Sequence, residues 1–203
     1  MKIICIGRNY ADHAREMKSA VPTVPVFFIK PDTALVTGNR PFFLPDFSKE
    51  VHHEVEVVLR ISREGSRIPE ADAPGHFRKI GLGVDFTARD LQHEMKEKGL
   101  PWEIAKGFDH SAPVSRFFSL KRFGDIRNLS FRLDLNGATV QEGNTSGMIF
   151  SFEAIIAYIS RFVTLRRGDL VFTGTPAGVG PVNKGDRLEG FLGGIRMFDF
   201  KVE

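Results

Sequence analysis

The chain has 203 residues, of which 42% are hydrophobic and 26% charged, and its formal net charge is only +3. One cysteine excludes an internal disulfide and a cysteine metal cluster, and no apolar run reaches membrane-spanning length. No run of five or more Lys or Arg is present, so the basic pI is weak support for nucleic-acid binding. We therefore expect a cytoplasmic protein without a nucleic-acid or membrane partner, whose mildly basic character suits acidic metabolites.

The N-terminal part predicts a strand over residues 2–6 and then a short helix over residues 10–20, for which Asn9 is a plausible N-cap. On that helix His13 and Glu16 lie three residues apart and so share one face. A carboxylate beside an imidazole fixes the tautomer of the ring and raises its basicity, as a general base requires. A surface ion pair on a short helix explains the same pattern.

A strand pattern over residues 51–61, VHHEVEVVLRI, places Glu54 and Glu56 on one face, while the opposite face is mostly aliphatic. Two such carboxylates repel each other, and near a core they also lose hydration. A hard cation such as Mg²⁺, Mn²⁺ or Ca²⁺ between them would remove both penalties. A solvated edge strand is the alternative. A zinc-protease motif is excluded because position 57 is Val rather than His.

A further strand is predicted over residues 80–86, and Asp85 near its end could supply a third carboxylate. Thr87 is a credible N-cap for a helix over residues 88–98. An acid at a strand end, followed by an Arg one turn inside a helix, is a common arrangement for a polar site. The helix and the segment after it carry further polar side chains, namely Arg89, Gln92, Lys96 and Lys106.

The C-terminal half adds a hairpin with Asn136-Gly137 at its turn and a helix over residues 152–162 capped by Ser151. The apolar stripe of that helix, which includes Phe162, is expected in the core. After a strand at 170–173 comes GTPAGVGPV, which lacks the Gly-Lys-Ser/Thr of a phosphate loop. A tight backbone loop near a carboxylate-bearing ligand fits better, with Thr175 as hydroxyl donor. No linker or repeat divides the chain.

Taken together, these segments resemble the fumarylacetoacetate hydrolase family and, within it, the small acylpyruvase and oxaloacetate decarboxylase branch. The resemblance spans nearly the whole chain, in the family order. It is carried by IGRNYADHAREM (6–17), VFFIKP (26–31), VHHEVEVVL (51–59), GLGVDFTARDLQ (81–92), GLPWEIAKGFD (99–109), TSGMIFS (145–151), GDLVFTGTPAGVGPV (168–182) and KGDRLEG (184–190).

The resemblance implies an α+β, mainly β fold, a mixed sandwich roll with a few short helices. It implies one catalytic domain over residues 1–203, with residues 8–25 as a mobile lid, and a homodimer. It also implies a Mg²⁺ or Mn²⁺ site whose ligands are Glu54, Glu56 and Asp85. The catalytic residues implied are His13, Glu16 and Lys106, and the substrate-binding residues are Arg8, Arg89, Gln92, Lys106 and Thr175.

The activity that the resemblance implies is metal-dependent hydrolysis of a C–C bond in acylpyruvate-type 2,4-dioxo acids, with decarboxylation of oxaloacetate as a second reaction. Both reactions pass through the enolate of pyruvate, and the substrate partner is a small 2-oxo acid. The alternatives are an oxaloacetate tautomerase and a 2-hydroxyhepta-2,4-diene-1,7-dioate isomerase. A non-catalytic metabolite-binding protein is a more remote alternative, since a binder needs no general base.

Overall fold

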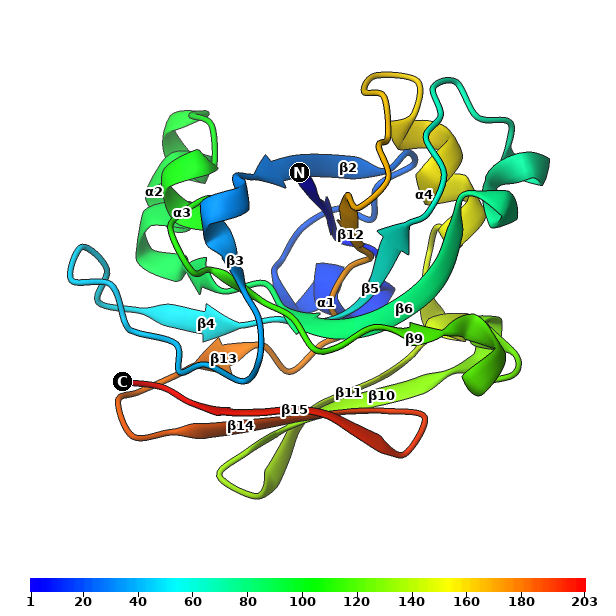
Figure 1. Ribbon diagram of the computed structural model, residues 1–203. Coiled ribbons are helices and arrows are strands. Elements are labelled where there is room, and N and C mark those ends of the chain that lie inside the picture. Colours follow the sequence, from blue (N-terminus) through cyan, green and yellow to red (C-terminus); the bar gives the residue numbers. More distant parts are fainter.

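The computed structural model describes residues 1–203 and is organised around a six-stranded sheet (Figure 1). Its order is β2-β1-β12-β5-β6-β9. The pairing of β1 with β12 is parallel and the other pairings are antiparallel. The six strands are β1 (Ile3–Gly7), β2 (Val26–Lys30), β5 (Val55–Ile61), β6 (Phe77–Val84), β9 (Phe118–Ser119) and β12 (Leu170–Phe172).

A four-stranded antiparallel sheet forms the second layer, below the first in Figure 1. Alternate aliphatic residues of β5 and β6 pack against it in one continuous core. Asn136 and Gly137 both have positive φ, as a type I′ hairpin turn requires, so the predicted hairpin is confirmed. The strands, in the order β11-β10-β14-β15, are β11 (Ala138–Asn144), β10 (Ser130–Leu135), β14 (Arg187–Leu192) and β15 (Ile195–Lys201).

The predicted strand over residues 51–61 is divided in two at Glu54. β4 (Val51–His53) leaves the large sheet and pairs with β13 (Gly180–Pro181) and β7 (Thr87–Ala88), while β5 stays inside it. The alternation in sequence does not show this change of partner, because both pieces are extended. A further small sheet pairs β3 (Leu35–Val36) with β8 (Ala112–Pro113).

Few helices accompany the sheets, so the expected α+β, mainly β fold is confirmed. The α-helices are α1 (Ala11–Glu16), α2 (Arg89–Lys98), α3 (Glu103–Lys106) and α4 (Phe152–Ile159). The 3₁₀ turns span Asp32–Ala34, Glu70–Gly75, Leu120–Arg122, Ile126–Asn128 and Thr145–Gly147. No helix is both long and apolar enough to cross a membrane. The sequence pattern missed the single turn of α3.

Ser151 caps α4 as expected, because its hydroxyl accepts from the backbone N–H of Ala154. Phe162 lies beyond the helix and is exposed, so its predicted place in the core is wrong.

Two other predicted N-caps are also wrong. Tyr10 and Ala88 are the N-cap residues of α1 and α2. Asn9 instead donates from Nδ2 to the carbonyl oxygen of Thr173 at 2.7 Å and accepts from the backbone N–H of Phe150. Both candidate caps, Asn9 and Thr87, are fully buried and bond to distant segments, and local spacing does not reveal such partners.

Candidate active site

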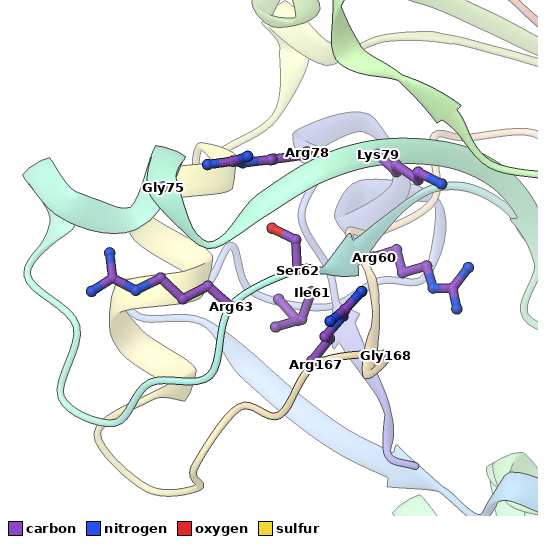
Figure 2. A pocket seen from close by; sticks show the side chains of 9 residues that line it. All are labelled: Arg60, Ile61, Ser62, Arg63, Gly75, Arg78, Lys79, Arg167 and Gly168. Atoms are coloured by element: carbon purple, nitrogen blue, oxygen red, sulfur yellow. The ribbon is translucent and has the colours of Figure 1, made fainter.

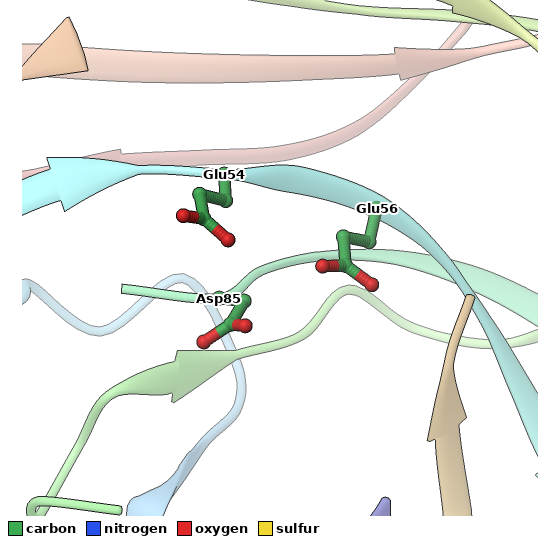
Figure 3. Close-up of side chains that lie close together, drawn as sticks. All are labelled: Glu54, Glu56 and Asp85. Atoms are coloured by element: carbon green, nitrogen blue, oxygen red, sulfur yellow. The ribbon is translucent and has the colours of Figure 1, made fainter. Parts of the chain in front are cut away.

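Three buried carboxylates meet where β5 begins and β6 ends (Figure 3). Glu54 stands between β4 and β5, Glu56 lies on β5, and Asp85 directly follows β6. The backbone N–H of Asp85 donates to the carbonyl oxygen of Glu54, which fixes the two segments together. Ligand oxygens of the three side chains lie within 4.8 Å of one another, and none of the residues is more than 5% exposed. The alternative of a solvated edge strand is therefore wrong.

The negative charges of these carboxylates are balanced to different extents by neighbouring cations. Burial would raise the pKa of Glu54, but the charges of Lys106 and Arg89 hold it below its ordinary value. Glu56 forms no ion pair and accepts one hydrogen bond, from the backbone N–H of Gly174 at 2.6 Å. Burial raises the pKa of Glu56 well above its ordinary value, and the charges of Asp85 and Glu54 raise it further. The cluster is self-repulsive at Glu56.

Lys106 and Arg89 are the cations closest to Glu54. Lys106 Nζ donates to Glu54 Oε2 and Asp85 Oδ2, both at 2.8 Å, and to Thr87 Oγ1 at 2.6 Å. Burial opposes the charge of Lys106, but Asp85 and Glu54 raise its pKa above the ordinary value. Arg89 Nη2 donates to Glu54 Oε1 and Arg89 Nη1 to Gln92 Oε1, both at 2.6 Å. The first turn of α2 thus supplies the Arg and Gln together.

Lys30 is a site residue that sequence reasoning missed. It ends β2, is fully buried, and donates from Nζ to the carbonyl oxygens of Phe86 and Ser111 and to Ser111 Oγ. Its Nζ also lies 2.7 Å from Asp85 Oδ1, but without hydrogen-bond geometry, so that buried oxygen has a nearby charge and no donor. The available signal was a lone Lys at the end of an apolar strand, in VFFIK.

These observations fit a divalent cation. The cluster offers only oxygen ligands, Asp85 Oδ1 has no donor, and Glu56 has no ion-pair partner. A buried carboxylate without a partner is unfavourable, and a bound cation would remove that cost. Carboxylate oxygens suit Mg²⁺ and Mn²⁺. The three carboxylates are therefore a buried candidate metal site.

The predicted dyad lies over this cluster. His13 is buried, and its Nδ1 lies 3.2 Å from Glu16 Oε2, while Glu16 Oε1 accepts from the backbone N–H of Gly178 at 3.0 Å. A surface ion pair is therefore a poor description of His13. With Nδ1 engaged, Nε2 is the ring nitrogen left to exchange a proton with a ligand.

All predicted site residues except Glu16 line one cavity. Glu16 lies outside the lining and contacts His13 through its Nδ1. The free volume is only about 30 Å³, because side chains of the site bond to one another across it. A 2-oxo acid needs more room, so its entry requires a shift of α1 or of these side chains. The predicted residues that line it are Arg8, His13, Glu54, Glu56, Asp85, Arg89, Gln92, Lys106 and Thr175.

The structure changes the predicted set of substrate contacts at Thr175 and at Lys96. Thr175 lines the cavity, but its Oγ1 donates to the carbonyl oxygen of Val55 and accepts from Gln141 Nε2, so the hydroxyl is engaged within the protein. Lys96 also lines the cavity, with Nζ 5.6 Å from the ring centre of Trp102. Burial and the charges of Arg89 and Arg8 lower the pKa of Lys96 to about 8. The cavity thus holds enough cationic groups for a dianionic ligand in addition to a metal.

The raised pKa of Glu56 predicts a pH-dependent stability of the metal-free protein. Between the unfolded pKa near 4.5 and the higher folded pKa, the folded state binds more protons, so stability falls as pH rises. In EDTA, the Tm of the parent protein should therefore fall relative to that of Glu56→Gln across this window. Added Mg²⁺ should reverse the difference, because it replaces the proton. Parallel Tm curves for the two proteins in EDTA would contradict this.

Comparison with known proteins agrees with the geometry. Residues 2–202 match the family model described as fumarylacetoacetate (FAA) hydrolase C-terminal. A mouse protein named oxaloacetate tautomerase FAHD1, mitochondrial, is 46% identical over 201 residues, which are 99% of this chain and 91% of that protein. The Escherichia coli protein named oxaloacetate tautomerase YcgM is 45% identical over 188 residues, which are 92% of this chain and 86% of that protein.

A solved structure shares the fold. The crystal structure of fumarylpyruvate hydrolase from Pseudomonas aeruginosa in complex with Mn²⁺ and pyruvate matches with a TM-score of 0.94 and 39% sequence identity. The match covers 100% of this chain and 89% of that one.

Proposed function

The chain belongs to the fumarylacetoacetate hydrolase family of enzymes, and from this premise we propose that its principal reaction is the keto–enol tautomerisation of oxaloacetate. The observation that carries the proposal is the buried His13, held by the more exposed Glu16 and set over a carboxylate cluster in a cavity rich in cations. The cations of such a cavity can bind a dianion such as oxaloacetate, and His13 can move a proton at C3 of that substrate. The names of the mouse and Escherichia coli relatives support oxaloacetate as the substrate.

Glu54, Glu56 and Asp85 would hold Mg²⁺ or Mn²⁺. When bound, such a cation supplies Lewis acidity at the 2-oxo group and so makes C3 more acidic. Lys106 and Arg89, which now bond to Glu54, are placed to turn toward the carboxylate beside the oxo group. Arg8 and Lys96 line the same cavity and would neutralise the second carboxylate of oxaloacetate.

His13 would carry the proton. The Glu16 carboxylate accepts a hydrogen bond from Nδ1–H of His13. Nε2 is then free to take a proton from C3 of the substrate, and in the reverse direction to return it to C3. The contact of Glu16 with Gly178 holds the carboxylate in place while it orients the ring. Burial of His13 and the small free volume of the cavity keep bulk water away from the transferred proton.

Hydrolysis of acylpyruvates is a second candidate function, supported by the likeness to the Pseudomonas structure with Mn²⁺ and pyruvate. Here His13 would deprotonate a water that attacks the distal carbonyl carbon. The C3–C4 bond then breaks and the pyruvate part leaves as its enolate, which takes a proton at C3. Decarboxylation of oxaloacetate gives the same pyruvate enolate. An isomerase of 2-hydroxyhepta-2,4-diene-1,7-dioate would use a related proton transfer.

The test is a comparison of kcat/KM on one protein sample. Freshly dissolved enol-oxaloacetate is followed by the loss of its ultraviolet absorbance, and acetylpyruvate and fumarylpyruvate hydrolysis are measured beside it, each with Mg²⁺, with Mn²⁺ and with EDTA. Tautomerisation should give the largest value and should stop in EDTA. A larger value for an acylpyruvate would make hydrolysis the principal reaction. Absence of all these activities in the presence of metal would overturn the proposal.

We further propose that residues 8–25 act as a lid of a single catalytic domain over residues 1–203. The lid carries His13, and one hydrogen bond, from Gly178 to Glu16, joins its helix to the loop across the cavity. Because the free volume is about 30 Å³, opening of this segment would give the substrate the room that it needs. Amide hydrogen exchange should be faster in residues 8–25 than in β5 and should slow when oxalate, a 2-oxo acid mimic, is added with Mg²⁺.

A homodimer remains a prediction, which the exposed apolar side chains support. Phe43, Phe47, Ile104 and Phe162 are each more than half exposed, although 19 Phe residues are available to fill the core. Light scattering at micromolar concentration should give a mass near twice the 22.7 kDa of one chain. A mass of one chain would contradict the dimer.

A further inference from the structure

A second cavity lies at the other end of β5, away from the carboxylates. Its volume is about 600 Å³, far more than that of the candidate active site. Arg60 follows Glu56 by four positions, so at ~3.3 Å per residue the two sites are about 13 Å apart or more along the strand. The cavity lies where β5 and β6 pass into loops beside the turn before β12 (Figure 2).

Cationic side chains dominate the lining of this basic cavity. They come from three separate stretches of the chain, and Ile61 is the one apolar residue among the nine that line it. No carboxylate oxygen lies within 4.0 Å of any of these cations, and the nearby Asp169 is engaged by Lys2. The five unpaired cations are Arg60, Arg63, Arg78, Lys79 and Arg167.

The sheet itself places two of these charges against each other. Arg60 on β5 and Lys79 on β6 are directly opposite partners in an antiparallel pair. Like charges in that position destabilise the pairing, where an opposite pair would stabilise it. Arg167 adds a third charge from the turn before β12, where it reaches toward the same space (Figure 2). The three side chains are exposed, so solvent screens part of this repulsion, and an anion that shares the space would remove more of it.

The cavity also contains a polar group without a partner. Ser62 Oγ is buried and forms no hydrogen bond, although it lines the cavity. In Figure 2, Arg63 and Arg78 lie on one side of Ser62, and Arg60 and Lys79 lie on the other. A buried hydroxyl without a partner is costly, and a turn of the Ser62 side chain toward the cavity would let the hydroxyl donate to an anion oxygen there.

We propose that the basic cavity binds a compact polyanion that carries two or more phosphate or carboxylate groups. Four of the five cations are Arg, whose planar guanidinium groups suit bidentate contact with either group. The volume suits a small metabolite. No aromatic ring lines the cavity, so it offers no platform on which nucleic-acid bases could stack. This site is separate from the proposed tautomerase reaction and does not depend on it.

Isothermal titration calorimetry on the full chain tests the proposal, with pyrophosphate and citrate as probes and orthophosphate as the weakly charged reference. Both polyanions should bind one to one, and the tighter of them identifies phosphate or carboxylate as the preferred group. Arg60→Gln/Lys79→Gln should weaken binding at least about tenfold, because two charge-assisted contacts to the anion are lost. Ser62→Ala should weaken it less.

Two controls separate the basic cavity from other sources of binding. Lys184→Gln/Lys201→Gln removes the same charge from exposed positions outside the cavity and should leave affinity unchanged. Glu56→Gln should also leave the affinity for the probe unchanged. If the probe were instead bound at the carboxylate cluster, this substitution would change the affinity. Without a probe, Arg60→Gln/Lys79→Gln should have a higher Tm than the parent, because the cross-strand repulsion is gone.

The proposal is overturned if neither polyanion binds, or if the two double variants weaken binding equally. It is also overturned if the affinity is lost in Glu56→Gln but kept in Arg60→Gln/Lys79→Gln. If a single-stranded RNA binds more tightly than both polyanions, and if Arg60→Gln/Lys79→Gln abolishes that binding, the surface would be assigned to nucleic acid instead.

Discussion

Glu54→Gln is expected to abolish turnover of oxaloacetate and to leave the protein folded. The substitution removes one of three carboxylates and with it the charge that a divalent cation requires. A metal contributes several kcal/mol to transition-state stabilisation, and each ~1.4 kcal/mol is a factor of ten, so a loss of at least about a thousandfold is expected. Lys106 and Arg89 keep hydrogen bonds to Asp85, Thr87 and Gln92, which limits the structural damage.

The readouts are kcat for oxaloacetate tautomerisation at saturating Mg²⁺ and the rise of Tm on adding Mg²⁺. Both should be lost in Glu54→Gln, because the site no longer binds the metal. Glu64→Gln is the matched control, since Glu64 is exposed and lies outside the site. Activity of Glu54→Gln within tenfold of the parent, or unchanged activity of EDTA-stripped parent protein, would show that the carboxylate cluster is not the metal site.

His13→Ala is expected to slow tautomerisation of oxaloacetate by roughly 10²–10⁴, the usual range for loss of a general base. Hydrolysis of acylpyruvates should fall by a similar factor, because water must be deprotonated. Decarboxylation of oxaloacetate should suffer less, since its C–C bond breaks without removal of a proton from C3. Glu16→Gln should follow the same order more mildly, because the imidazole remains but its orienting charge is lost.

The three rates are measured at saturating Mg²⁺, with His93→Ala as the control because His93 is exposed on α2. Equal losses in all three reactions would show that His13 acts in closing the lid or in positioning the substrate, and the assigned proton transfer would then be wrong.

The sequence pattern indicated a carboxylate pair because its signal is local, with a solvated strand face as the alternative, and the family resemblance assigned the three metal ligands. Glu54 and Glu56 follow the period of a strand, and Asp85 ends another strand. The split at Glu54 was not predictable, since it depends on pairing of β4 with residues far along the chain. Lys30 was missed for the same reason: its partner Ser111 is 81 residues away. Thr175 was proposed from its loop as a hydroxyl donor, and Arg8 was assigned through the family resemblance alone.

The overall composition and net charge of the chain did not reveal the basic cavity. A net charge of +3 over 203 residues suggests no patch, and no run of Lys or Arg marks one. Arg60 and Lys79 become neighbours only through the register of β5 and β6, and Arg167 joins them through the turn before β12. Side-chain clusters built from several strands are therefore the part of a site that composition and spacing predict least well.

The central claim is that this site moves a proton at C3 of a 2-oxo acid. Exchange of the pyruvate methyl protons with D₂O, followed by ¹H NMR at saturating Mg²⁺, measures that step without cleavage of a C–C bond. We predict that the protein speeds loss of the methyl signal well above the blank, and that EDTA, Glu54→Gln and His13→Ala each remove the effect. A rate equal to the blank with metal-loaded parent protein, or equal acceleration by His13→Ala, would contradict the claim.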